Sequence, residues 1–170
     1  MDKPKQSPRL ILGIDPGTRV SGYGLIQVLD NQYIAIDYGC IRPPPQYKLS
    51  ERYLVIYEGV HELIAKYRPD ELVVETQYVN KNVQSAIKLG MARGAVLIAA
   101  KKNKLPIFEY TPTKAKKSIG NGRASKYQVQ MMVQRLLNLL DVPPEDAADA
   151  LALAICHSHT SEHMISTFEI

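Results

Sequence analysis

Four acidic residues in this sequence stand where their side chains could share metal ions. Asp15 and Glu75 each end a short apolar run, a pattern typical of a buried strand. Asp146 and Asp149 lie three residues apart at the start of an alanine-rich segment, so both fall on one face of a predicted helix. Carboxylates suit Mg²⁺, and two such ions can position water and stabilise the leaving oxygen in phosphodiester cleavage. One hypothesis for this set is therefore a metal-dependent phosphodiesterase site.

Each acid also has an ordinary structural explanation. The helix dipole favours acids such as Asp146 and Asp149 in a first turn. Asp15 precedes Pro16 and Gly17, which is typical of a turn, and Glu75 could be an exposed strand end. Spacing alone leaves the catalytic and the structural explanation open.

The elements that would position these acids follow from apolar periodicity and from proline and glycine breaks. Three consecutive strands come first, and helices then alternate with strands. This order predicts one α/β domain over residues 1–170, with a five-stranded mixed sheet flanked by helices and flexible ends at 1–7 and about 160–170. The predicted strands are 10–15, 22–29, 33–41, 71–75 and 105–110, and the predicted helices are 49–67, 83–102, 125–140 and 145–158, with 112–119 ambiguous.

Small residues inside the predicted helix 83–102 set it apart from the others. Gly90 and Gly94 stand in its middle, with Ala92 and Ala95 beside them. A helical glycine costs up to about 1 kcal/mol against alanine. We expect close packing against another element to offset this cost.

Basic residues gather in one part of the chain. The net charge is +4, and between Lys101 and Lys126 there are eight basic residues and one acid, Glu109. Such a block suits a phosphate-backbone surface, although a solvated basic loop and helix end would look the same. Tyr78 follows Glu75 on a polar loop, where it could stack on an unpaired base or be partly buried. The candidate DNA-binding residues are Tyr78, Lys81, Lys114, Lys116, Lys117, Arg123 and Lys126.

Several other classes of protein are disfavoured. Cys40 and Cys156 form no disulfide framework, and buried thiols in a reducing compartment are expected. The histidines near Cys156 fit no standard zinc spacing, so we expect a helix end with partly solvated histidines. No Gly-x-Ser-x-Gly elbow, signal core or stretch of about 20 apolar residues is present. The sequence therefore predicts a cytoplasmic protein without a membrane span.

The order of the motifs resembles the RuvC family of Holliday-junction resolvases over most of the chain. The opening Gly-Ile-Asp-Pro-Gly-Thr of residues 13–18 is similar to that of the family, and so is Asp-Ala-Ala-Asp-Ala-Leu-Ala at residues 146–152. Between them, similar segments occur at residues 21–24, 39–42, 88–94, 108–110 and 126–130.

The resemblance implies a ribonuclease-H-like fold and a homodimer that makes paired nicks across four-way junction DNA during recombination and repair. It implies that Mg²⁺ is required, with two ions per site and Mn²⁺ as a substitute, and that the protein acts with the branch-migration helicase complex RuvA-RuvB. Asp15, Glu75, Asp146 and Asp149 fall on the family's catalytic acids. Tyr78 falls where the family usually has a base-stacking phenylalanine. Lys116 and Lys126 fall on basic residues tied to DNA binding and catalysis.

Other functions remain open at this point. A related ribonuclease-H-like nuclease acting on RNA would carry similar acids. A junction-binding module without catalysis would keep its affinity when the acids become amides. An actin-like phosphotransferase, whose phosphate loop also begins with Asp-x-Gly-Thr, is disfavoured because one domain of this size supplies no two-lobed cleft. If the chain is a dimer, helix 83–102 is the expected interface.

Overall fold

The computed structural model describes residues 7–30, 32–77, 82–160 and 162–170, which form a five-stranded mixed sheet in the order β3-β2-β1-β4-β5. The antiparallel strands β1 (Arg9–Asp15), β2 (Ser21–Leu29) and β3 (Gln32–Ile41) come first. The strands β4 (Glu71–Glu75) and β5 (Ile107–Tyr110) then add in parallel on the other side of β1. The predicted α/β class and the mixed five-stranded sheet are confirmed. The helices are α1 (Leu49–Tyr67), α2 (Val83–Lys102), α3 (Pro112–Ser118), α4 (Lys126–Leu136), α5 (Glu145–Ser158) and α6 (Glu162–Ile165), followed by the 3₁₀ turn η1 (Ser166–Phe168).

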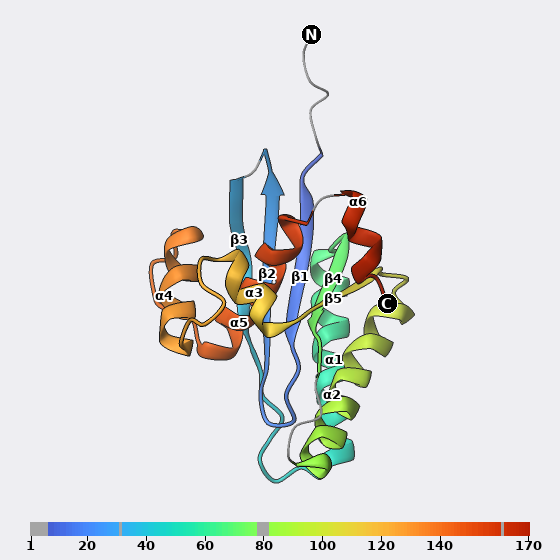
Figure 1. The fold of residues 1–170 in the computed structure, drawn as a ribbon. Coiled ribbons are helices and arrows are strands. Elements are labelled where there is room, and N and C mark those ends of the chain that lie inside the picture. The colour runs from blue at the N-terminus through green and yellow to red at the C-terminus, as the bar shows by residue number, and fades with distance from the viewer. Residues whose placement is uncertain (1–6, 31, 78–81, 161) are drawn as a thin grey trace.

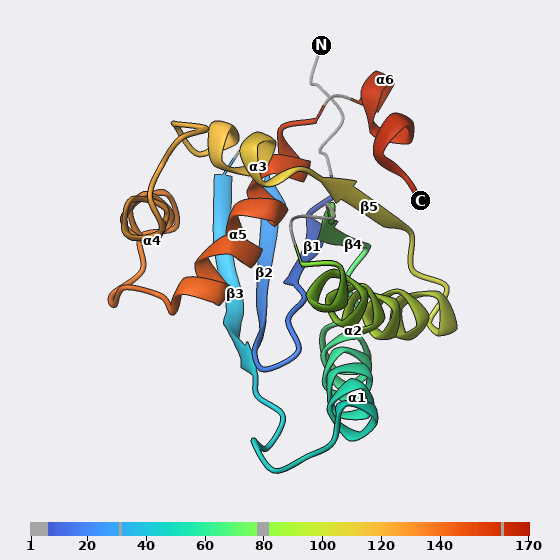
Figure 2. The same cartoon turned by 60° about the horizontal axis from the view of Figure 1, so that its bottom comes forward.

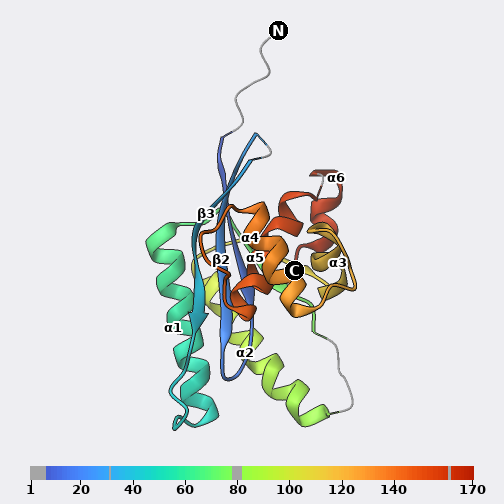
Figure 3. The same ribbon diagram turned by 90° about the vertical axis from the view of Figure 1, so that its left-hand side faces the viewer.

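Helices cover both faces of this sheet, as Figures 1 and 3 show. The helices α3, α4 and α5 lie over one face, where Ile11 and Val73 join their core. The helices α1 and α2 lie over the other face, where Leu12 and Val74 belong to a second core. Neighbouring residues of one strand point to opposite faces, so a strand between two helical layers must be apolar throughout. This explains why β1 and β4 are almost continuous apolar runs.

Helix α5 lies unusually close to the sheet because glycines face it. Gly13 of β1 and Gly24 of β2 are register partners, and a Cβ atom on Gly13 would collide with the carbonyl oxygen of Ala150. A Cβ atom on Gly22 would collide with the carbonyl oxygen of Asp146 in the same way. The missing side chains therefore allow the first turn of α5 to rest beside the end of β1.

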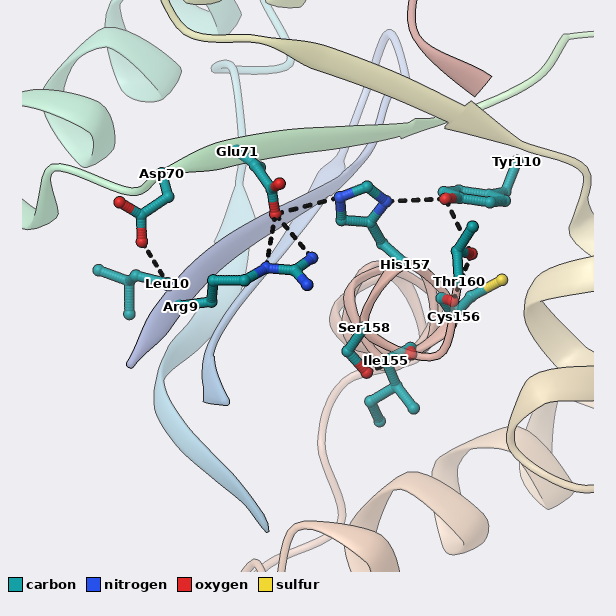
Figure 4. A network of polar contacts seen from close by, with 10 residues as sticks. All are labelled: Arg9, Leu10, Asp70, Glu71, Tyr110, Ile155, Cys156, His157, Ser158 and Thr160. Carbon is teal, nitrogen blue, oxygen red and sulfur yellow. Dashed lines mark hydrogen bonds and ion pairs between the residues drawn. The ribbon is translucent and has the colours of Figure 1, made fainter. Parts of the chain in front are cut away.

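The other end of α5 is held by a buried polar network, which Figure 4 shows from close by. His157 has no exposed surface; its Nδ1 lies 2.7 Å from Oη of Tyr110, and its Nε2 lies 3.1 Å from Oε2 of Glu71. The Tyr110 hydroxyl donates to Thr160 at 3.0 Å, and Arg9 donates to Glu71 at 2.9 Å. The prediction of partly solvated histidines is thus wrong for His157, because strands from distant parts of the chain enclose it.

The C-terminal segment is paired with strand β5. The amide of Ile170 donates to the carbonyl of Ile107 at 2.9 Å, and Glu169 forms an antiparallel bridge with Phe108. The ring of Phe168 stacks on Tyr110 with 4.7 Å between centroids. The last residues therefore form the helical turns α6 and η1 and pair with β5.

Two helical boundaries were predicted incompletely. Residues 112–118, which were ambiguous in the sequence, form α3 with the side chain of Thr111 accepting a hydrogen bond from the Lys114 amide. Helix α4 begins after its predicted N-cap Ser125 but ends at Leu136, earlier than expected. Asn138 takes a left-handed conformation with φ of 49°, which stops the helix although apolar residues continue.

Helix α2 buries one side and exposes the other. Ala92, Val96 and Ala99 pack in the core, but a Cβ atom on Gly94 would meet nothing within 4 Å. The prediction that the helical glycines pack closely against another element of the chain is therefore wrong for Gly94. The exposed side carries Val83, Ile87, Met91 and Ile98.

By length and composition alone, α2 is the one described helix that could cross a membrane. Arg93 interrupts its apolar sequence and pairs with Glu109 of β5 at 2.5 Å. This pair holds α2 against the sheet, and its exposed apolar side chains resemble a protein interface.

Candidate active site

Three of the four candidate acids line one cavity of about 250 Å³. Asp15 and Glu75 end the neighbouring parallel strands β1 and β4, so they reach the same edge of the sheet. Asp149 lies above them on the first turns of α5. The remaining wall is formed by Pro112, Ala115, Lys116, Lys126 and Ala152.

Asp146 belongs to the same acidic group, although it does not line this cavity. Its carbonyl oxygen rests against Gly22, the register partner of Asp15. Its negative charge raises the pKa of both Asp15 and Asp149. The seating of α5 on the glycines thus brings the helical pair of acids to the strand-end pair, as the spacing predicted.

The charges nearest to Asp15 and Glu75 are mainly those of other acids. Burial raises the pKa of Asp15 to about 8, and the charges of Glu75, Asp149 and Asp146 add to that effect. Burial and the charge of Asp149 raise the pKa of Glu75 to about 7. Burial likewise raises the pKa of Asp149. Carboxylates in such a group hold their protons until an added cation favours the ionised form.

Two lysines act against this repulsion from the rim of the cavity. The charges of Lys116 and Lys126 lower the pKa of Glu75 and Asp149, and Lys126 also lowers that of Asp15. Lys126 is mostly exposed and pairs with Glu145, which raises the pKa of its ammonium group. Sequence reasoning missed Glu145; its position next to Asp146 was the available signal.

The donor set fits a hard divalent cation that is only partly coordinated by protein. Among the described residues, no three Asp, Glu, His or Cys side chains are arranged so that together they could hold one ion. Mg²⁺ is usually bound by one or two carboxylates, with waters and substrate phosphate completing its shell. Pairs drawn from the four acids meet that requirement, and the raised pKa values of Asp15 and Glu75 show which repulsion a cation would relieve.

The other candidate DNA-binding residues are spread around this cavity. Lys114 and Lys117 line a neighbouring cavity of about 290 Å³, and the Lys114 ammonium lies 3.4 Å from the ring centroid of Phe168. Arg123 is exposed between α3 and α4. Tyr78 and Lys81 lie outside the described residues.

The chain matches known sequences and structures over most of its length. The family described as "Crossover junction endodeoxyribonuclease RuvC" matches residues 11–157. The RuvC protein of Protochlamydia amoebophila is 67% identical over 151 residues, which cover 88% of this chain and 90% of that protein. The RuvC protein of Shewanella loihica is 48% identical over 158 residues, covering 92% and 91%.

A solved structure described as T. thermophilus RuvC in complex with Holliday junction substrate has a TM-score of 0.78 at 32% identity. It covers 88% of this chain and 92% of the other. The yeast mitochondrial Holliday junction resolvase Ydc2, at 17% identity and a TM-score of 0.63, shares the fold over 91% of this chain and 80% of its own. The predicted ribonuclease-H-like fold is thereby confirmed, and the chain belongs to the RuvC family of crossover junction endodeoxyribonucleases.

Proposed function

We propose that this protein is a structure-selective endonuclease that resolves four-way (Holliday) DNA junctions during recombination and repair. It does so by paired, symmetric, metal-dependent phosphodiester hydrolysis, and its nuclease domain spans the whole chain. The observation that supports this most directly is the cavity where Asp15, Glu75 and Asp149 converge under the charge of Asp146. Its walls supply both the acids that a metal needs and the lysines that a phosphate needs.

The metal ligands in this proposal are Asp15, Glu75, Asp146 and Asp149. Two Mg²⁺ ions, with Mn²⁺ as a substitute, would supply an activated water and stabilise the leaving oxygen. Asp15 and Glu75, whose pKa values are raised, would give up their protons to hold such ions, and β1, β4 and α5 fix the directions of the four acids. Because these elements share two well-packed cores, the acids need little rearrangement before the reaction.

Lys116 and Lys126 hold the phosphate backbone at the rim of this cavity. Both already act electrostatically on the acids, so a phosphate placed between lysines and metal ions meets positive charge from two sides. Lys114, Lys117 and Arg123 continue the positive surface along α3 and the following loop. Lys81 adds a further backbone contact, and Tyr78 stacks on a base at the junction centre.

A homodimer places two such cavities on symmetry-related strands. The exposed apolar side of α2, with Ile87, Met91 and Ile98, is the proposed two-fold interface. Gly94 has open space above it, which would admit the backbone of a second copy. Replacing Met91 by Glu is expected to give monomers in analytical ultracentrifugation, whereas unchanged dimers would exclude α2. In the cytoplasm, the dimer would act with the branch-migration helicase complex RuvA-RuvB.

The test is cleavage of a synthetic mobile four-way junction with Mg²⁺, beside a matched linear duplex and an RNA-containing duplex. We expect symmetric nicks in the junction alone, and none from the Asp146→Asn protein. Junction binding without nicks in any divalent metal would favour a binding module. Cutting of the RNA substrate alone would favour a ribonuclease.

A further inference from the structure

A second cavity lies near the same edge of the sheet and is lined by two arginines. It measures about 330 Å³, and its walls are Arg19, Pro43, Pro45 and Arg52. Arg19 comes from the loop between β1 and β2, and the other three come from the segment that joins β3 to α1 and from α1 itself. Figures 1 and 2 show both connections at one end of the sheet, and Figure 2 places them away from α3.

The two guanidinium groups differ in how they are held. Arg52 donates from Nε to the carbonyl of Tyr47 at 2.9 Å and from Nη2 to the carbonyl of Pro45 at 2.5 Å. An arginine has five N–H donors, so three remain for a ligand on a side chain that is already fixed in place. Arg19 is exposed and, within the described part of the chain, makes no side-chain hydrogen bond or ion pair.

The loop that carries Arg19 is firmly attached to the acid cavity. Asp15 ends β1, and Arg19 follows four residues later, so their Cα atoms are at most about 14 Å apart. The amide of Gly17 donates to the Ser21 hydroxyl at 3.1 Å, and that hydroxyl donates back to the Gly17 carbonyl at 3.0 Å. Ser21 is fully buried, so the loop is clamped at its base.

We propose that the cavity formed by Arg19, Pro43, Pro45 and Arg52 is a second phosphodiester-binding subsite for the DNA that is cut at Asp15. Two guanidinium groups with free donors face it, and among the residues that the structure describes no acid lines it, which suits a phosphate oxygen pair. This inference rests on the proposed function. A DNA strand advances about 3.4 Å per nucleotide, so the subsite holds a phosphate within about four nucleotides of the cut.

The two basic regions would then contact the DNA at different points. Lys116 and Lys126 act at the phosphate to be cut, because they line the acid cavity itself. Arg19 and Arg52 act on a phosphate farther along, because they line a cavity without acids. Two anchoring points fix the direction of the backbone through the acid cavity, as one point cannot.

The test compares Arg19→Gln and Arg52→Gln with Arg68→Gln as a matched control. Arg68 is exposed at the end of α1, just before β4 begins, and therefore lies at the opposite edge of the sheet. Junction binding is measured by fluorescence anisotropy without divalent metal, at several NaCl concentrations between 50 and 200 mM. Loss of one phosphate contact should make the negative slope of log K, the association constant, against log salt concentration shallower by about 0.9. It should also weaken binding by about 3- to 10-fold.

A second measurement locates the phosphate. Single neutral methylphosphonates are placed at each position near the cut, and binding by the wild type and by Arg19→Gln is compared. We expect one position within about four nucleotides where the neutral group weakens the wild type and leaves the variant unaffected. Because Arg52 also supports its own loop, the Arg19 variant is the decisive one.

The outcomes separate this subsite from the proposed function. If the wild type nicks the junction while all three arginine variants show the wild-type salt slope, the subsite is excluded and the nuclease stands. If no methylphosphonate position distinguishes the wild type from Arg19→Gln, the subsite is likewise excluded. A wild type that neither binds nor nicks the junction would overturn both.

Discussion

Strand β4 carries two glutamates whose surroundings are opposite. Glu71 begins the strand and meets His157 and Arg9, whose charges and hydrogen bonds outweigh burial and hold its pKa below the usual range. Glu75 ends the strand, where burial and the charge of Asp149 raise its pKa to about 7. Both side chains are partly buried, so the difference comes from the charges beside them.

Helix α5 spans the same two regions. Its end at His157 closes a network in which Glu71 pairs with Arg9 and lies against His157. Its beginning carries Asp146 and Asp149, whose negative charges lie near those of Asp15 and Glu75. A region with its charges matched internally contributes to stability, whereas a region that needs an external cation points to function.

The largest expected effect is the difference in nicking activity between substitutions of the two glutamates. Glu75→Gln removes a proposed metal ligand and should slow junction nicking by about 10³-fold, or about 4 kcal/mol of transition-state stabilisation. Glu71→Gln should nick within about threefold of the wild type, since its network lies at the other end of β4. Single-turnover cleavage at saturating protein measures both, and similar losses in the two variants would remove the distinction.

The seating of α5 gives the next largest effect. A Cβ atom in Gly22→Ala would meet the carbonyl of Asp146, so we expect a loss of about 1–3 kcal/mol in the free energy of unfolding, together with slower nicking. Gly122→Ala is the matched control. Its Cβ atom would meet Thr113 and Lys117 only at ordinary van der Waals distances, so the free energy of unfolding should change by less than about 0.5 kcal/mol. Urea unfolding with a chelator present tests the pair, and equal effects would contradict the close approach.

The two substitutions should also differ in their effect on stability. Here Glu71→Gln, which hardly affects nicking, should have the larger effect. Glu71→Gln leaves His157 without its carboxylate and should lower the free energy of unfolding by about 1–3 kcal/mol. Glu75→Gln removes a carboxylate that its neighbours repel, so the metal-free protein should be as stable as the wild type or more so. A metal-free Glu75→Gln protein that is the less stable of the two would refute this assignment.

A further effect is expected on the pH dependence of the metal-free stability. The folded-state pKa of Asp15, about 8, lies above its value in the unfolded chain, about 3.9. As pH rises from about 4 to 8, the unfolded chain releases that proton first, so metal-free stability should fall. Glu71 has a lowered pKa and contributes stability that is lost only as pH falls through that value.

Thermal unfolding of the chelator-treated protein at several pH values measures this trend. Asp15→Asn should flatten the decline between pH 5 and 8. A midpoint that rises over that range in the wild type would mean that the acids are already paired.

Much of the fold could be predicted because its signals are local. Helices α1 and α2 and strand β4 have their predicted bounds, since apolar periodicity marks the helices and Pro69 separates α1 from β4. The convergence of Asp15 and Glu75 was also predictable, because the parallel strands β1 and β4 end at one edge. The end of α4 was not, since Leu139 and Leu140 continue its apolar pattern while Asn138 turns the chain.

The features that could not be predicted depend on residues far apart in the sequence. A histidine at a helix end is typical of solvent exposure, and only the approach of Arg9 and Glu71 shows that His157 is buried. The arginine cavity likewise joins two separate connections. The glycines under α5 gave a usable signal, because Gly22 and Gly24 alternate along one face of β2.

Metal binding by the wild type, Glu71→Gln and Glu75→Gln tests the central claim most directly. Titration calorimetry with Mn²⁺ at pH 6.5, in two buffers of different ionisation enthalpy, reports both affinity and released protons. The wild type and Glu71→Gln should bind alike and release about one proton or more per chain, because Asp15 and Glu75 must ionise. Glu75→Gln should bind more weakly and release fewer. Binding without proton release, or binding that Glu75→Gln leaves unchanged, would contradict the claim that these acids form a cation-binding site.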